Sequence, residues 1–444
     1  MIKNRTRVSQ FIFSSSLLLS IFLSLVFYDS SNGTDFNRYY RYVEYFLGNA
    51  EYTSREQGVF YFWTIYKVAE IGSILSNVNN IEPLINIAVQ ISNIIYYLFG
   101  TYGFFKLLKF YKFQSGDIYI VLSFLNFFPP LFGARLIMKP EILAFSFLPW
   151  ILYLLETYLE SKQLLKLVYL IPLILFSFTA KAFITASLGL LLILKFFPRI
   201  KEFNVMHLFY FIIPTLFLCF LIFYNDYRIN NVGFLYHELV QQYNYKASLS
   251  LIYNFDINQL IHYPFRDNVR DSFLGITLID LFGDYFERYW DHNRSVFFEN
   301  RIESSKYNLN LLRRYLSMML SLVMILISLF TVKSKKFKLY SRSYFLGIFL
   351  ILLTAYGFFG TYFNPDKGDT LKTHYYSYLL ALSFIFILIE LIQNIRPIFG
   401  YSVFSIYFLI IMFIFGFPWS INIELINVIF SQILSFHNFL IYIL

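Results

Sequence analysis

The sequence has few charged residues for its length. Only 14% of its 444 residues are Asp, Glu, Lys or Arg, whereas 58% are hydrophobic. A soluble protein of this size could not cover its surface with so few charges. The composition therefore argues against a water-soluble protein and indicates one that is embedded in a membrane.

Cysteine is almost absent as well. The single residue, Cys219, lies in an apolar run, so an intramolecular disulfide and a cysteine-based metal site are both excluded. The sequence also has no Walker loop, no glycine-rich dinucleotide loop and no HExxH motif. We therefore expect no metal and no cofactor. The net charge of +9 is explained by basic loops beside a membrane and does not indicate a nucleic-acid partner.

Long apolar runs are abundant. Each run is roughly 17 to 22 residues long, which is the length that spans the hydrocarbon layer of a membrane. The alternation of polar and apolar residues that is typical of membrane β-barrels is absent. We predict an all-α, polytopic transmembrane helical bundle of about 11–12 spans, with residues 1–444 forming a single integral membrane domain. The predicted spans cover residues 11–28, 84–108, 117–134, 140–158, 164–179, 182–197, 206–224, 314–332, 344–361, 374–392, 399–417 and the polar-interrupted 425–443.

Basic residues alternate between the breaks that separate these spans. The run that follows Lys3, Arg5 and Arg7 is long for a signal peptide and no small-x-small cleavage site follows it, so we expect an uncleaved first helix with a cytoplasmic N-terminus. Every second break is then basic, which supports a multi-pass topology. The high usage of Ile, Asn, Lys and Phe suggests an AT-rich bacterial genome, so we expect the protein in the bacterial inner membrane. Residues 29–83 and 225–311 become extracytoplasmic loops with amphipathic or interfacial helices.

Two carboxylates on the predicted outer side are candidates for chemistry. Asp35 follows the first span closely, and a carboxylate at a water–lipid boundary is well placed to take a proton from a hydroxyl. The alternative is a helix N-cap. Glu141 opens a helix behind Arg135, Lys139 and Pro140, where it either stabilises the helix dipole or faces a cavity.

Cations accompany these acids in other outer breaks. Lys181 lies in a tight turn between two apolar runs, where a lone amine must reach the interface or find an anion. Lys372, His374 and Tyr375 lead directly into a later span. Two such cationic groups suit a phosphate, although a solvated hairpin with a salt bridge explains this loop equally well.

The order of these segments resembles the GT-C superfamily of membrane glycosyltransferases, which includes aminoarabinose-transferase-like and protein-mannosyltransferase-like enzymes. The matching segments are residues 33–40, 139–141, 178–184 and 372–375. The long loop 225–311 is larger than the simplest members need.

The resemblance implies a GT-C-like fold and inverting transfer of a sugar from a polyprenyl-phosphate-linked donor to a glycan, lipid or protein acceptor. Asp35 would be the general base, and Glu141 would act beside it. The remaining roles would be donor-phosphate binding by Lys139, Lys181, Lys372 and His374, and substrate contacts by Arg38, Tyr39, Arg135 and Tyr375.

Two other functions stay open. A surface-polysaccharide polymerase also has many helices and large outer loops, and would be indicated by a groove lined by Arg266, Arg270, Arg288 and Arg294. A membrane transporter or lipid flippase would show paired repeats and ionisable groups near the bilayer midplane, and mid-span charges are scarce here.

Overall fold

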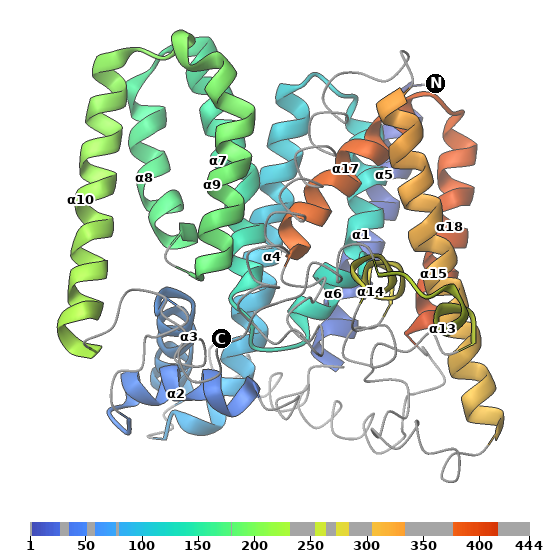
Figure 1. The fold of residues 1–444 in the computed structure, drawn as a ribbon, viewed down its shortest axis with the longest axis horizontal. Helices are drawn as coiled ribbons and strands as arrows, with labels where there is room; N and C mark the ends of the chain where they lie inside the picture. Colours follow the sequence, from blue (N-terminus) through green and yellow to red (C-terminus); the bar gives the residue numbers. More distant parts are fainter. Residues whose placement is uncertain are drawn as a thin grey trace.

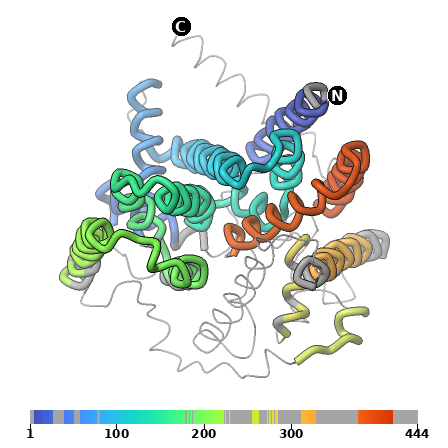
Figure 2. Tube along the Cα trace, turned by 90° about the horizontal axis from the view of Figure 1, so that it is seen from above, coloured from blue at the N-terminus to red at the C-terminus, as the bar shows by residue number. Residues whose placement is uncertain are grey.

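The computed structural model describes residues 2–26, 35–50, 58–76, 80–178, 180–230, 254–262, 272–283, 304–333 and 376–415. Every regular element within these ranges is a helix, which confirms the all-α prediction for this part of the chain. The long helices run side by side as a bundle, with the short helices α2 and α3 at one end (Figure 1). Figure 2 shows the same helices from above, with α1, α4, α5, α7 and α17 grouped around the centre.

The helix bounds follow the hydropathy pattern closely. In chain order, the helices are α1 (Ile2–Val26), α2 (Asp35–Leu47), α3 (Phe60–Ser76), η1 (Glu82–Leu84), α4 (Ile85–Phe110), α5 (Ser115–Asn126), α6 (Pro129–Arg135), α7 (Glu141–Ser161), α8 (Leu164–Phe178), α9 (Ala182–Phe196), η2 (Phe197–Glu202), α10 (Val205–Asn230), α13 (Ile257–His262), α14 (Phe273–Asp280), α15 (Ser304–Lys333), α17 (Ser377–Gln393) and α18 (Pro397–Ile414).

Five helices of the described chain are long and apolar enough to cross a membrane, or six if the bent pair α5–α6 counts as one span. Two further apolar helices, α8 and α17, are shorter. These helices support a multi-pass membrane protein, although fewer of them reach the length and hydropathy of a span than the predicted 11–12. The predicted spans 344–361 and 425–443 lie outside the described residues.

The predicted span 117–134 corresponds to a bent pair of helices. Helix α5 ends at Asn126 and α6 begins at Pro129, with a bend of 61° between them. Two successive prolines explain the break, since proline has no N–H for the helix ladder and disfavours helical geometry in the residue before it. Phe128 is accordingly extended, with φ −71° and ψ 113°.

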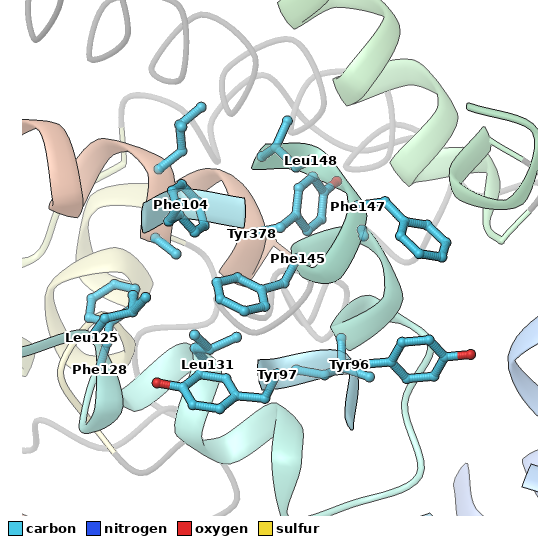
Figure 3. Close-up of a cluster of buried hydrophobic side chains, with 14 of the residues drawn as sticks. Tyr96, Tyr97, Phe104, Leu125, Phe128, Leu131, Phe145, Phe147, Leu148 and Tyr378 are labelled. Atoms are coloured by element: carbon cyan, nitrogen blue, oxygen red, sulfur yellow. The ribbon is translucent and has the colours of Figure 1, made fainter. Parts of the chain in front are cut away.

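The core forms where α4 packs against α7, and two glycines allow the close approach. A Cβ atom on Gly100 would lie 2.6 Å from the ring of Phe145, and one on Gly103 would lie 2.8 Å from the indole nitrogen of Trp150. Small residues let helix backbones approach in this way in membranes. The ring of Tyr97 then stacks on Phe145 at 5.6 Å between centroids, within the buried cluster drawn in Figure 3.

The basic breaks meet at one end of the bundle. Arg5 forms an ion pair with Asp117 at the start of α5, and the Tyr401 hydroxyl of α18 donates to the carbonyl of Arg5 at 3.3 Å. Lys162, after α7, donates to the carbonyl of Glu202 at 2.5 Å. Helices α2 and α3 lie at the opposite end (Figure 1). The shared end agrees with the predicted alternation of basic breaks, and its cytoplasmic orientation stays a prediction.

Candidate functional site

Glu141 and Lys181 form a buried ion pair at the end of the bundle opposite the basic breaks. Glu141 is the first residue of α7 and is 0% exposed, and Lys181 caps the start of α9 in an extended conformation. The Lys181 ammonium lies 2.8 Å from Glu141 Oε1. A buried carboxylate is costly without a cation, so each of these two sequence-predicted residues accounts for the burial of the other.

The second oxygen of Glu141 has a different environment. Glu141 Oε2 is buried, and no hydrogen-bond partner for it exists among the described residues. Buried carboxylate oxygens normally accept at least one hydrogen bond. This oxygen is therefore a buried acceptor that the described residues leave unsatisfied.

Lys139 connects the start of α7 to α2. Its ammonium donates to the hydroxyl of Tyr39 at 3.2 Å and lies 4.7 Å from the centroid of the same ring. Both side chains are buried, and such cation–aromatic contacts strengthen when water is excluded. Tyr39 lies on α2 one helical turn after Asp35, the first residue of that helix, so the two positions share a face. The side chains of Asp35 and Arg38 lie outside the described part of the structure.

The non-helical segment 136–140, which carries Lys139, is held by two residues that sequence reasoning missed. The Asn93 amide donates to the carbonyls of Arg135 at 3.1 Å and of Ile137 at 2.9 Å. The Tyr61 hydroxyl donates to Asn93 Oδ1 at 2.7 Å and accepts from the Lys139 N–H at 3.2 Å. A buried asparagine within a predicted span was the available signal, because polar side chains in lipid-spanning helices need partners.

Arg135 is buried between helices α4, α5 and α6. It is 2% exposed, and its guanidinium lies 3.9 Å from the centroid of the Tyr97 ring. It donates to the carbonyl of Asn126 at 2.7 Å, and so satisfies the last backbone acceptor of α5 where the chain bends. This placement gives Arg135 a role in supporting the break between α5 and α6, and it does not bring the guanidinium to the Glu141–Lys181 pair.

Helix α17 begins beside the same ion pair. Tyr378, in its first turn, is 0% exposed and its hydroxyl is hydrogen-bonded to that of Ser187. The hydroxyl also interacts electrostatically with Glu141 and Lys181. The predicted phosphate-binding residues Lys372 and His374, like Tyr375, lie just before this helix and outside the described residues.

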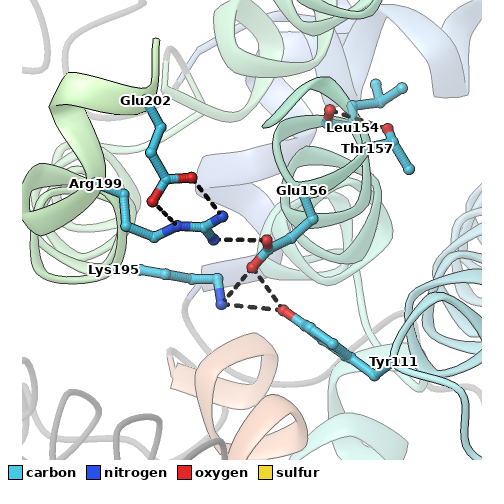
Figure 4. Close-up of polar contacts among 7 residues, drawn as sticks. All are labelled: Tyr111, Leu154, Glu156, Thr157, Lys195, Arg199 and Glu202. Carbon is cyan, nitrogen blue, oxygen red and sulfur yellow. Dashed lines mark hydrogen bonds and ion pairs between the residues drawn. The ribbon is translucent and has the colours of Figure 1, made fainter. Parts of the chain in front are cut away.

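A second charged cluster lies at the other end of α7, near the basic breaks. Glu156 Oε1 accepts from Tyr111 and Lys195, each at 2.8 Å, and Oε2 accepts from Arg199 at 2.8 Å. Arg199 also forms a two-point contact with Glu202, with both bonds at 3.0 Å (Figure 4). These bonds join the end of α4 to α7, α9 and η2, so this cluster has the features of a structural clamp.

The described residues contain no group of three or more His, Cys, Asp or Glu side chains that could hold a metal ion. The prediction of a metal-independent site stays untested by this observation, because His374 and most of the segment 225–311 lie outside the described residues.

Comparison of the sequence and the structure with known proteins does not identify a family. No family model matches the sequence, and no match is found among curated proteins or solved structures.

Proposed function

We propose that this protein is a glycosyltransferase that moves a sugar from a polyprenyl-phosphate-linked donor to an acceptor hydroxyl at the extracytoplasmic face of the membrane. One observation carries the proposal. Three segments far apart in sequence converge, because Lys139 contacts Tyr39 of α2 at 3.2 Å and Glu141, two residues after Lys139, contacts Lys181 before α9 at 2.8 Å. They converge at the end of the bundle that lies away from the basic breaks.

The proposed chemistry is an inverting displacement. The acceptor oxygen attacks the anomeric carbon while Asp35 takes the hydroxyl proton, and the bond between that carbon and the lipid-phosphate oxygen breaks. The phosphate leaves with the electron pair, and a cation must stabilise its developing charge. Lys181 is the proposed cation, joined by Lys372 and His374 from the segment before α17. Arg38 and Tyr375 are proposed to contact the sugar.

Glu141 has two proposed tasks. One oxygen holds Lys181 in place at 2.8 Å, and the other is a buried acceptor without a partner in the described structure. A hydroxyl of the acceptor or of the sugar would satisfy that oxygen and would be oriented by it. Lys139 is proposed to hold α2, and with it Asp35, against the start of α7.

The decisive experiment replaces Asp35 with Asn in protein reconstituted into liposomes with polyprenyl-phosphate sugars. Removal of a general base costs about 10²- to 10⁴-fold in turnover, and we expect a loss in that range at unchanged expression. Glu44→Gln is the matched control, because Glu44 is another acid of α2, two turns further along. We expect it to keep turnover within about threefold of wild type.

Near-normal turnover of the Asp35→Asn variant would overturn the proposed base. Wild-type activity only with diphosphate-linked oligosaccharides would favour a surface-polysaccharide polymerase instead. A groove lined by four arginines would indicate that alternative. All four lie outside the described residues, namely Arg266, Arg270, Arg288 and Arg294.

A further inference from the structure

The start of α3 contacts each of the segments that carry the proposed site. The N–H of Gly58 donates to the carbonyl of Ala180 at 2.9 Å, directly before Lys181. Two residues later, the ring of Phe60 stacks on Phe176 of α8 at 3.7 Å between centroids. The start of α3 therefore contacts the turn between α8 and α9 at the end of α8 and again just before α9.

The next two residues of α3 contact the other two segments. The Phe62 ring stacks on Tyr42 at 4.6 Å and tilts against Tyr39 at 5.9 Å, so it packs on the buried face of α2. The Tyr61 hydroxyl accepts from the Lys139 N–H at 3.2 Å. Residues 58–62, which lead into the first turn of α3, thus connect α2, the segment 136–140 and the Lys181 turn.

Tyr61 has a chemical role that no apolar residue could replace. The N–H of Lys139 lies in a non-helical segment that is buried, and a buried backbone N–H needs an acceptor. A tyrosine hydroxyl can accept one hydrogen bond and donate another. At 0% exposure, Tyr61 does both, because it also donates to Asn93 at 2.7 Å. Asn93 in turn holds the carbonyls of Arg135 and Ile137.

We infer that Tyr61 is a positioning residue for sugar transfer, acting through Lys139 on the helix that begins with Asp35. The inference rests on the proposed function. Tyr61 fixes the Lys139 backbone, the Lys139 side chain contacts Tyr39, and Tyr39 lies one turn from the proposed base. Lys181 is held independently by Glu141 and by the turn at Ala180, so the donor-phosphate contact does not depend on the Tyr61 hydroxyl.

Tyr61→Phe tests this inference because it removes one oxygen atom and keeps the ring. We expect kcat to fall about tenfold or more, since small misplacements of a reacting group have large effects on rate. The KM for the lipid-linked donor should stay within about twofold of wild type, because Lys181 is not displaced. Amide hydrogen exchange at residues 136–140 should become faster, most clearly at Lys139.

Tyr66→Phe is the matched control on the same helix. The Tyr66 hydroxyl donates to Glu70 at 3.1 Å within α3 and does not reach the segment 136–140. We expect this variant to keep wild-type kcat, KM and exchange rates. A general weakening of α3 would instead change both variants in the same direction.

Three results would overturn the inference while wild-type protein is active. The first is normal turnover in the Tyr61→Phe variant. The second is a loss of turnover that is fully explained by a smaller amount of folded protein. The third is a loss of turnover without faster amide hydrogen exchange at Lys139. A wild-type protein that is inactive with every polyprenyl-linked sugar would overturn the proposed function itself. The two failures are therefore distinguishable.

Discussion

The two ends of α7 each carry a buried glutamate, and their surroundings differ. At the basic end, both oxygens of Glu156 accept hydrogen bonds from Tyr111, Lys195 and Arg199. At the opposite end, Glu141 has one oxygen on Lys181 and a second oxygen without a partner among the described residues. The saturated carboxylate is suited to hold helices together, and the unsaturated one is suited to receive a ligand.

The strongest test of this comparison is Glu141→Gln. The amide oxygen can still accept from Lys181, but the negative charge that holds the ammonium is lost, and the NH₂ group takes the place of an acceptor oxygen. We expect turnover per folded molecule to fall about 100-fold, equivalent to about 2.7 kcal/mol in the barrier. The free energy of unfolding should also fall, by about 1–3 kcal/mol, because the Lys181 ammonium is only 17% exposed and loses the charge of the carboxylate beside it. The measurement is initial-rate transfer in liposomes, together with SDS-titrated unfolding.

Glu156→Gln is the same substitution at the saturated end, and there the effect should fall on stability. One amide oxygen cannot accept from Tyr111, Lys195 and Arg199 together, so at least one of these hydrogen bonds is lost, and the negative charge between the two cations is removed. Both cations are partly exposed, at 16% and 37%, which limits the loss to about 1–3 kcal/mol in the free energy of unfolding. Turnover per folded molecule should stay within about threefold. Equal effects of the two substitutions on both readouts would abolish the distinction between the two ends.

The smallest effect is expected at the exposed edge of the clamp, where Glu202 pairs with Arg199. The hydrogen bonds from Arg199 lower the pKa of the Glu202 carboxyl below its usual 4.5. When the pKa of a carboxyl is lower in the folded state than in the unfolded state, the ionised carboxyl stabilises the fold at pH values above its unfolded-state pKa. This stabilisation is lost as the pH falls through the folded-state pKa. Glu202→Gln should therefore leave unfolding at pH 7 unchanged within error, because exposed pairs contribute little. Any difference in unfolding free energy between Glu202→Gln and wild type should disappear in acid. A difference that grew below pH 4.5 would contradict the pairing of the Glu202 carboxylate with Arg199.

Much of the fold could be predicted from the sequence. Apolar runs determined where helices α4, α7, α8, α9 and α18 begin and end to within a few residues, because a lipid environment requires each backbone segment to satisfy its own hydrogen bonds. The alternation of basic breaks also predicted which helix ends lie together. The bend after α5 was missed although Pro129 and Pro130 signalled it, because hydropathy alone does not register the loss of a backbone donor.

The candidate site was predictable only in part. Glu141 and Lys181 were singled out because isolated charges next to apolar runs need partners, and the structure pairs them at 2.8 Å. The roles of Tyr61 and Asn93 were not predictable, because both belong to apolar helices in which tyrosine and asparagine form no motif. The hydrogen bond from Arg135 to the end of α5 was not predicted, and its proposed contact with a substrate stays a prediction.

The sequence by itself determined that the chain is helical, that it belongs in a membrane, and which short polar segments interrupt its apolar runs. These properties follow from composition and local periodicity, which each segment carries alone. Only the tertiary structure decided that Glu141 meets Lys181, forty residues away, while Glu156 meets Lys195 and Arg199. The reason is physical, since the pairing of buried charges depends on which helix ends pack together, and that packing is set by side-chain shapes spread over the whole bundle.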